Sequence, residues 1–421
     1  MKVRYLIKIG EMSLKGDNKS LFEKRLKKNI LSLLPDIKPQ ITIRDRRFYL
    51  DADESALDRV EEALSCTFGI VGFTRTTSSG KSMEELKQET AAELQRYVSK
   101  KYGPDEVEHI PEGEISFKIE PRRTDKSVPY SSYQIANEVG AHLNELFPFL
   151  RVDVKKPDLQ ICIEVREDVY IYIDEIKGLG GLPVGTAGKG LLMLSGGIDS
   201  PAAGYLMAKR GLSLNAVYFH TYPYTSDEAL EKVKTLADTL APYFIGTKLF
   251  VVPFTDFQLN IKEAAREEEV TLLMRAGMVK IAEKLAKNSY ADALITGESL
   301  SQVASQTIES LRFTGSMTDL PVLRPLIGFD KEEIISLTRS IGTYETSILP
   351  YDDCCTIFSP SHPLVKPKLD KMQESWRRLD ADDLIEKAVE ETEEVYFPPA
   401  PGNLPSDNPA SDKWPSYLEN T

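Results

Sequence analysis

Residues 190–200 hold the feature that most constrains the fold of this chain. The apolar run Leu191–Leu194 has the length and composition of a buried strand, and it stops at Ser195-Gly196-Gly197. A helical pattern follows from Ser200 to Gly211, with proline in its first turn and glycine at its end, where each is favoured. The sequence therefore predicts a strand that runs through a glycine-rich turn directly into a helix.

Such a turn can bind an anion, because it points unpaired N–H groups, the hydroxyls of Ser195 and Ser200 and the positive end of a helix at one place. It is not a Walker A motif, because it lacks the Lys-Ser or Lys-Thr pair after a longer glycine loop. We expect a phosphate or pyrophosphate as ligand. Asp199 offers the carboxylate that a bridging Mg²⁺ prefers. The alternative is a turn that serves the fold alone.

Composition limits the class of protein. A chain of 421 residues, 41% of them hydrophobic, predicts about two to four domains. No apolar run approaches the roughly 18 residues of a membrane span, and the first ten residues alternate like a strand instead of forming a signal peptide. Four cysteines in this length argue against a disulfide scaffold. We therefore expect a cytoplasmic protein with no membrane partner.

Charge is distributed unevenly along the chain. The net charge is −13, but residues 379–421 alone hold eleven acids and two bases, whereas the first 50 residues hold thirteen bases and five acids. Lys15 lies in a loop bounded by glycines, and Arg122, Arg123 and Lys126 follow a predicted strand. These four residues are candidates for binding the phosphate backbone of a nucleic acid, since local basic patches serve that purpose. A solvated basic helix is the alternative for the N-terminal charge.

Hydrophobic periodicity divides the chain into four parts. Residues 1–77 are predicted to form a small β-α-β-β-α unit and residues 78–177 a second α+β unit. Residues 178–394 alternate strand and helix, which is typical of a parallel sheet, and residues 395–421 are predicted to be a proline-rich, acidic, disordered tail. The glycine-rich stretch 178–188 is expected to be a flexible connector. The third part has predicted strands at 190–194, 214–219, 248–252, 292–296 and 321–324.

Further candidates follow the predicted strands, since ligands of an open parallel sheet bind beyond the carboxyl ends of its strands. Arg275 lies in the apolar stripe of a predicted helix. It either reaches a phosphate or pairs with a carboxylate, and both readings stay open. Gln302 and Gln306 share a face if their segment is helical.

The cysteines fall into two groups. Cys66 and Cys162 fit core positions, whereas Cys354 and Cys355 lie in a polar loop, where reactive thiols are the better explanation. Adjacent cysteines do not form a C-x-x-C zinc pair, and the four histidines are scattered. We predict no metal site built on cysteine or histidine.

Residues 195–200 resemble the pyrophosphate loop of the N-type ATP pyrophosphatases, and the chain from 1 to about 375 resembles the tRNA 4-thiouridine synthases, or tRNA sulfurtransferases, a family linked to thiamine biosynthesis. The segments that carry the wider resemblance stand in the family's order: Gly10–Gly16, Arg122–Lys126, Gly180–Gly185, Ser195–Pro201, Thr296–Thr307, Leu323–Ile327 and Cys354-Cys355.

The resemblance implies an α/β architecture: ferredoxin-like and THUMP α+β domains, then a doubly wound parallel-sheet ATP pyrophosphatase (PP-loop) domain. It implies that ATP adenylates the uridine at position 8 of tRNA and that a persulfide then supplies sulfur, with ATP and Mg²⁺ as cofactors and Asp199 and Cys355 as catalytic residues. The family's ATP contacts correspond to Met193, Leu194, Ser195, Gly196, Gly197, Asp199, Ser200, Tyr218, Phe219, Arg275, Gly297 and Gln306.

The sequence departs from the long form of the family, because no rhodanese domain follows Cys355. The persulfide is therefore expected from a separate cysteine desulfurase or another donor, with Cys355 carrying or resolving it and Cys354 as a second thiol. Family members are often dimers, which leaves a homodimer open. One alternative function is an amidating ligase that adenylates a small-molecule carboxylate, and another is a non-catalytic RNA-binding protein.

Overall fold

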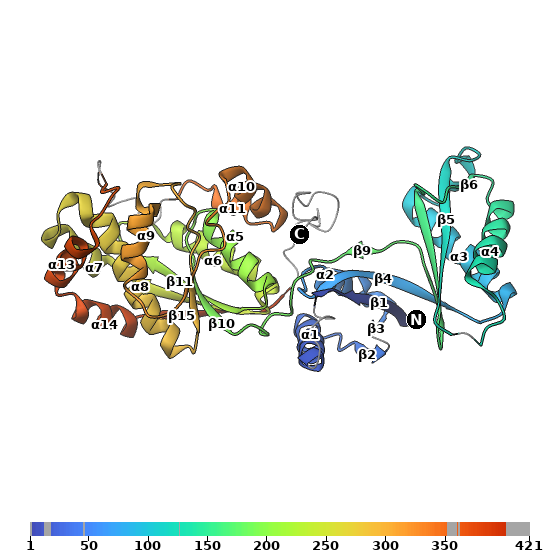
Figure 1. The fold of residues 1–421 in the computed structure, drawn as a ribbon, viewed down its shortest axis with the longest axis horizontal. Coiled ribbons are helices and arrows are strands. Elements are labelled where there is room, and N and C mark those ends of the chain that lie inside the picture. Colours follow the sequence, from blue (N-terminus) through green and yellow to red (C-terminus); the bar gives the residue numbers. More distant parts are fainter. Residues whose placement is uncertain are drawn as a thin grey trace. The chain divides into compact units, whose positions relative to one another are not determined.

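The computed structural model describes residues 2–11, 18–44, 47–125, 127–351, 360 and 363–400. The chain divides into two compact units, and the elements of both are labelled in Figure 1. Unit 1 comprises residues 1–9, 37–58 and 71–177, and unit 2 comprises residues 10–36, 59–70 and 178–421. Each unit is built on its own sheet.

Unit 1 contains a sheet in the order β2-β3-β1-β4-β8-β7-β5-β6, with β9 paired to β4. Its strands are β1 (Lys2–Ile9), β2 (Gln40–Arg44), β3 (Arg47–Asp53), β4 (Ile70–Ser79), β5 (Ile115–Arg123), β6 (Leu150–Val152), β7 (Leu159–Val165), β8 (Val169–Tyr172) and β9 (Ile176–Lys177). Strand β4 continues through residue 77, where the sequence predicts a boundary, and it pairs with both β9 and β8.

Two helices complete unit 1. Helices α3 (Met83–Tyr102) and α4 (Ser132–Leu146) pack on each other and, with β5, β7 and β8, enclose one apolar core. Each begins with a capping box, Ser82 with Glu85 and Ser131 with Gln134, which satisfies two of the free N–H groups of the first turn.

Unit 2 contains a six-stranded sheet in the order β14-β13-β10-β11-β12-β15. The strands are β10 (Lys189–Met193), β11 (Ser213–His220), β12 (Thr247–Pro253), β13 (Ala293–Ile295), β14 (Val322–Leu323) and β15 (Glu393–Phe397). The first five are parallel and fall at the predicted positions; β15 is antiparallel to β12. Residues 395–397, expected in the disordered tail, are thus part of the sheet, because β15 pairs along the free edge of β12.

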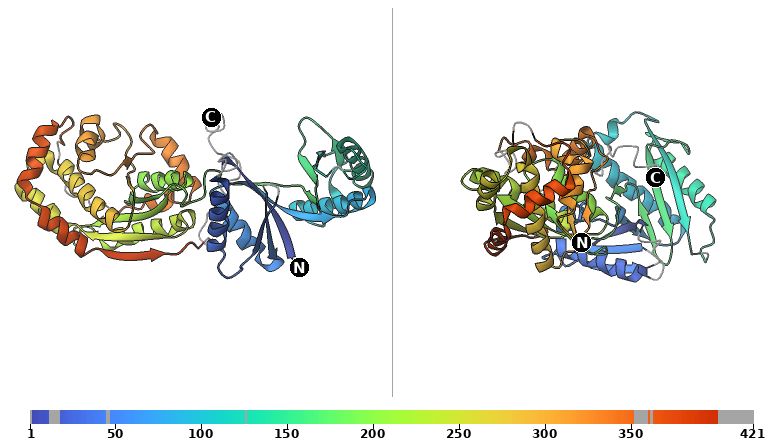
Figure 2. Two further views of the ribbon diagram at one scale, coloured as in Figure 1. Left: turned by 60° about the horizontal axis from the view of Figure 1, so that its bottom comes forward. Right: turned by 60° about the vertical axis from the view of Figure 1, so that its left-hand side comes forward.

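Helices cover both faces of this sheet (Figures 1 and 2). Leu191 and Val217 belong to the core beneath α8, whereas Leu192, one residue on, lies against α5, as alternation along a strand requires. The helices around this sheet are α5 (Asp199–Lys209), α6 (Asp227–Phe244), α7 (Thr255–Ala264), α8 (Val270–Asn288), α9 (Ile308–Gly315), α10 (Lys331–Ser340), α11 (Tyr344–Ser347), α13 (Leu369–Leu379) and α14 (Asp382–Glu390). Unit 2 also includes α1 (Lys19–Leu33) and most of α2 (Leu57–Ser65), which do not cover the sheet in Figure 1. None of the described helices is long and apolar enough to cross a membrane.

The glycine-rich stretch 178–188 is not the flexible connector that the sequence suggests. Gly180 exchanges two 2.7 Å backbone hydrogen bonds, donating to Ile70 and accepting from Gly69, and the Gly185 N–H donates to the Gly211 carbonyl at 2.8 Å. A Cβ on Gly181 would lie 2.3 Å from the Lys209 carbonyl oxygen. The glycines therefore permit close backbone packing at the end of α5.

Candidate nucleotide site

The predicted strand, turn and helix form as expected at residues 189–209. Beyond β10, the Leu194 N–H donates to the Val217 carbonyl at 2.9 Å, which keeps the chain on the sheet for one more residue. The Ser195 N–H donates to Ser200 Oγ at 2.9 Å, and the two serine hydroxyls lie 3.2 Å apart. The loop therefore closes on the N-terminus of α5, where free N–H groups attract an anion.

Gly197 leaves room for a ligand. Its φ is outside the left-handed region. Among the described residues beyond its chain neighbours, only Ser195 Oγ, at 3.7 Å, would lie within 4 Å of a Cβ there. Neither conformation nor packing inside the chain therefore requires glycine at this position. A phosphate group lying against the loop backbone would require it, because a methyl group would fill that space.

Asp199, the first residue of α5, has one carboxylate oxygen free for a ligand. Oδ2 accepts a 3.2 Å hydrogen bond from Gln302 Nε2, whereas Oδ1 is buried without a hydrogen-bond partner among the described residues. Burial raises the pKa of this carboxyl, and the Gln302 bond and the positive charge of Lys331 oppose the rise. A buried carboxylate oxygen with no partner suits a cation or a donor brought by a ligand.

Lys331 is a residue that the sequence reasoning missed. It is the first residue of α10, and residues 330–333 signal a capping box, which the structure confirms between Asp330 and Glu333 at 2.8 and 2.9 Å. Its charge acts on Asp199. A lysine beside a predicted helix start was the available signal, and only the fold brings its charge within electrostatic reach of Asp199.

Gly297 is pressed against the start of α5. A Cβ on Gly297 would lie 2.7 Å from both the Asp199 carbonyl carbon and the Ser200 nitrogen. Real Cβ atoms do not approach backbone this closely, so only glycine fits here. The end of β13 thereby lies directly beside the start of α5 and the loop that precedes it.

Arg275, on α8, pairs with a carboxylate, the second of the two readings that the sequence left open. Its guanidinium contacts Glu298 and donates to Ser305 Oγ at 2.8 Å. Glu298 also accepts from Arg324 Nε at 2.6 Å and from Thr296 Oγ1 at 2.9 Å. This cluster, Glu298 with Arg275 and Arg324, lies next to Gly297 in the chain.

The remaining nucleotide candidates lie near the ends of β10, β11 and β13. Leu194, Tyr218, Phe219 and Gln306 are buried and Met193 is half-buried. Gln306 Oε1 has no hydrogen-bond partner among the described residues. The helical face predicted for Gln302 and Gln306 does not form, because only a 3₁₀ turn (Ala304–Gln306) is present. Gln302 reaches Asp199 instead.

Cys66 and Cys162 are buried free thiols, as predicted. Burial raises the pKa of Cys66 to about 12 and raises that of Cys162 as well. Cys354 and Cys355 lie outside the described residues, as do Lys15 and Lys126. Thiolate chemistry is therefore unfavourable at both described cysteines.

The other two tRNA candidates lie on β5 in unit 1. Arg122 pairs with Glu120 at 2.8 Å and is largely exposed. Arg123 donates to the carbonyl oxygens of Val128, at 3.1 Å, and Tyr130. Arg122 is thus accessible to a phosphate backbone, whereas the contacts of Arg123 hold the loop that follows β5.

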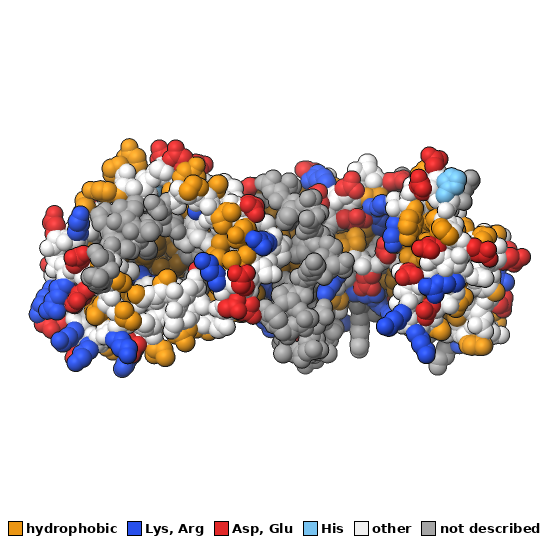
Figure 3. All heavy atoms as spheres, turned by 90° about the horizontal axis from the view of Figure 1, so that it is seen from above, with side chains coloured by type: hydrophobic (Ala, Val, Ile, Leu, Met, Phe, Trp, Pro, Cys, Tyr) orange, Lys and Arg blue, Asp and Glu red, His pale blue; other side chains and the backbone are white. Residues whose placement is uncertain are grey.

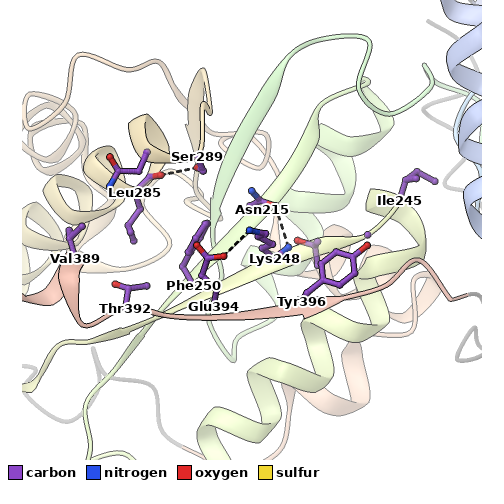
Figure 4. Close-up of a pocket in the computed structure, with 13 residues that line it drawn as sticks. Asn215, Ile245, Lys248, Phe250, Leu285, Ser289, Val389, Thr392, Glu394 and Tyr396 are labelled. Carbon is purple, nitrogen blue, oxygen red and sulfur yellow. Dashed lines mark hydrogen bonds and ion pairs between the residues drawn. The ribbon is translucent and has the colours of Figure 1, made fainter.

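A cavity of about 500 Å³ lies elsewhere in unit 2, at the amino ends of β11 and β12 (Figure 4). An ion pair between Lys248 and Glu394, 2.7 Å long, lines it. Ligands of parallel sheets bind at the opposite, carboxyl ends of the strands, so this cavity is not the candidate site. Among the described residues no group of three or more His, Cys, Asp or Glu could hold a metal ion.

The surface of unit 2 carries exposed apolar side chains, some of which are visible from above in Figure 3. Leu300, Val303 and Ile308 lie in the segment that also contains Gln302, and Ile348 and Leu349 follow α11.

Three family descriptions match consecutive parts of the chain. "ThiI ferredoxin-like domain" matches residues 4–74, "THUMP domain" residues 80–174 and "Thiamine biosynthesis protein (ThiI)" residues 185–380. The probable tRNA sulfurtransferase of Caldanaerobacter subterraneus is 45% identical over 94% of this chain and 100% of the relative. That of Treponema pallidum is 45% identical over 91% of this chain and 94% of the relative.

Solved structures agree. A 4-thiouridine synthetase, solved as an RNA complex with bound ATP, is 33% identical, with a TM-score of 0.86 over 94% of this chain and 100% of that one. The protein PH1313 from Pyrococcus horikoshii is 26% identical, with a TM-score of 0.63 over 81% of this chain and 99% of that one. The ferredoxin-like, THUMP and PP-loop architecture is therefore present, and the chain belongs to the ThiI family of tRNA sulfurtransferases.

Proposed function

We propose that this chain transfers sulfur to the uridine at position 8 of tRNA in an ATP-dependent reaction that yields 4-thiouridine. One observation carries the proposal: the loop before α5, with Asp199 at its end, has the geometry of a phosphate site in a chain that resembles a 4-thiouridine synthetase with bound ATP. The alternative function, an amidating ligase, does not account for the THUMP domain matched at residues 80–174.

The first step is adenylation. The O4 oxygen of the uridine attacks the α-phosphorus of ATP, and pyrophosphate leaves. Charge builds on the departing pyrophosphate, and the free N–H groups of α5 and the hydroxyls of Ser195 and Ser200 are placed to stabilise it. Lys331, whose positive charge acts on Asp199, would add to this stabilisation.

Mg²⁺ fits this site through Asp199. The buried Oδ1 atom, which has no partner among the described residues, is an oxygen ligand of the type that Mg²⁺ prefers, and the remaining ligands would be phosphate oxygens and water. Bound Mg²⁺ would neutralise charge on the phosphates. The chain's own part is to hold the carboxylate in place, through the Gln302 hydrogen bond and the start of α5.

The second step brings sulfur. In our proposal Cys355 carries a persulfide received from a separate donor, such as a cysteine desulfurase, and its terminal sulfur attacks C4 of the adenylated uridine while AMP leaves. A second thiol, from Cys354 or a small-molecule reductant, then attacks the Cys355 sulfur. This releases 4-thiouridine and leaves a disulfide that must be reduced before the next cycle.

Basic residues of both units would hold the tRNA. Arg122 is exposed on β5 in unit 1, and Lys126 follows it in the sequence, whereas Lys15 belongs to unit 2. Phosphate contacts of this kind position a nucleic acid without reading its sequence. ATP, tRNA and persulfide donors occur together in the cytoplasm, where we place the reaction.

The test uses unmodified tRNA, Mg-ATP, cysteine and a cysteine desulfurase, followed by digestion and mass spectrometry of the nucleosides. We expect 4-thiouridine in tRNA with uridine at position 8 and none when cytidine replaces it. No 4-thiouridine from a folded protein and a competent donor would refute the proposal.

A further inference from the structure

The Glu298 cluster has a charge imbalance beside the nucleotide site. One carboxylate contacts two guanidinium groups, those of Arg275 and Arg324, so the cluster carries one net positive charge. The Glu298 side chain is only 5% exposed, whereas the two arginine side chains are 20% and 21% exposed. The carboxylate is thus closed off from solvent, while both cations reach the surface.

The cluster also has N–H donors that make no hydrogen bond among the described residues. A guanidinium group offers five N–H donors. Arg324 uses Nε for Glu298 and Nη1 for the Val322 carbonyl at 3.4 Å, and its Nη2 makes no hydrogen bond to any residue within the described ranges. Partly buried cations with unused donors favour an anionic partner.

The fold places the cluster where that anion arrives. Glu298 directly follows Gly297, whose Cα packs against the Asp199–Ser200 peptide at the start of α5, and Arg324 directly follows β14. Strand β13 lies between β14 and β10, and β10 leads into the loop before α5. Glu298 and Arg324 therefore lie beyond the carboxyl ends of β13 and β14, where Arg275 contacts Glu298.

We propose that Glu298 is a positioning residue of the nucleotide site: it fixes Arg275 and Arg324 as a pair of cations for the phosphates of ATP. Glu298 itself does not touch the nucleotide. The inference rests on the proposed function, because it concerns the ATP of that reaction, and it adds Glu298 and Arg324 to the residues that serve the nucleotide.

The experiment measures the Kd of α,β-methylene-ATP and of adenosine by calorimetry on the full chain, for wild type, Glu298→Gln and Glu283→Gln. Glu283 is the matched control, because its carboxylate is also buried and also contacts two cations, Lys280 at 3.5 Å and Lys287 at 3.0 Å. It lies on α8, near the C-terminal end of that helix. Thermal unfolding is recorded for all three proteins.

For Glu298→Gln we expect the Kd of α,β-methylene-ATP to rise at least about tenfold, with that of adenosine changing less than about twofold. Glu283→Gln should lower Tm comparably and leave both Kd values unchanged. If Glu298→Gln lowered Tm but left the Kd of α,β-methylene-ATP unchanged, the cluster would only stabilise the fold, and the inference would be overturned. An equal rise in the Kd of adenosine would overturn it as well. No binding of α,β-methylene-ATP by wild type would refute the proposed function instead.

Discussion

Gly297 and Ser200 are in closer contact than any other amino acid at position 297 would allow: a Cβ there would lie 2.7 Å from the Ser200 nitrogen. This backbone contact packs the segment after β13 against the first turn of α5. The phosphate loop is consequently held from two sides, by the bonds between Ser195 and Ser200 within it and by the Gly297 backbone outside it.

Gly297→Ala should abolish tRNA thiolation. The added methyl group forces β13 and α5 apart at the backbone, and overpacking of this kind typically costs about 1–3 kcal/mol of stability. Gly328→Ala is the control, since a Cβ at Gly328 meets nothing within 4 Å. Full 4-thiouridine formation by Gly297→Ala, measured by nucleoside mass spectrometry, would show that the contact does not matter.

Gly197→Ala should leave the fold intact and weaken ATP binding. Nothing in the described chain lies within 3.7 Å of the new methyl group, so Tm should stay within a few degrees of wild type, but the group occupies the space given to a phosphate. We expect the Kd of ATP to rise by about tenfold or more. An unchanged Kd would mean that the phosphates lie elsewhere.

Sequence patterns predicted the five parallel strands and the loop because alternation and turn chemistry are local properties. They did not predict the Glu298 cluster, which joins residues 275, 298 and 324 through the fold, or the role of Lys331 beside Asp199. The prediction of a flexible connector at 178–188 was wrong. Its glycines allow close backbone packing against Ile70 and Lys209, and the local sequence does not distinguish this role from flexibility. What depends on tertiary contact was beyond the sequence.

Cys66 and Cys162 should resist alkylation in the native protein. With a pKa of about 12, the Cys66 thiol is ionised to roughly one part in ten thousand at pH 8, and it is also shielded from reagent. Peptide mass spectrometry after iodoacetamide treatment should find both unlabelled until denaturant is added. Rapid native labelling of Cys66 would contradict the buried position.

Cys355→Ser should block thiolation and spare adenylation. The serine hydroxyl cannot carry a persulfide, whereas ATP would still be cleaved when tRNA is present. Pyrophosphate release and 4-thiouridine are measured on the same sample, with Cys66→Ser as the control for loss of a thiol that is not involved. Retained thiolation in Cys355→Ser would assign the sulfur relay to another group.

Glu164 on β7 should make unit 1 sensitive to acid. Burial alone would raise the pKa of Glu164, but Arg47 at 3.2 Å, Arg166 at 2.9 Å and the Tyr172 hydroxyl together lower it. A carboxyl with a lowered folded pKa stabilises the fold above its ordinary value, about 4.3, and this contribution is lost as the pH falls through the folded value.

The substitution Glu164→Gln should therefore cost about 3–5 kcal/mol at pH 7, because two arginines lose their buried partner, and the gap to wild type should narrow toward pH 3. Glu120→Gln, at the more exposed pair with Arg122, should cost about 1 kcal/mol or less. Urea unfolding across this pH range checks both. If the difference in unfolding free energy between wild type and Glu164→Gln grew toward pH 3, the pKa of Glu164 would be raised in the folded protein and not lowered, which would contradict this prediction.

In the proposed reaction, the loop before α5 binds the ATP that adenylates a tRNA uridine. AMP released and 4-thiouridine formed are measured in one reaction with unmodified tRNA, Mg-ATP and a persulfide donor, for wild type and Asp199→Ala. We predict equal amounts of the two products for wild type and neither for Asp199→Ala. 4-Thiouridine formed without AMP, or undiminished in Asp199→Ala, would contradict the account.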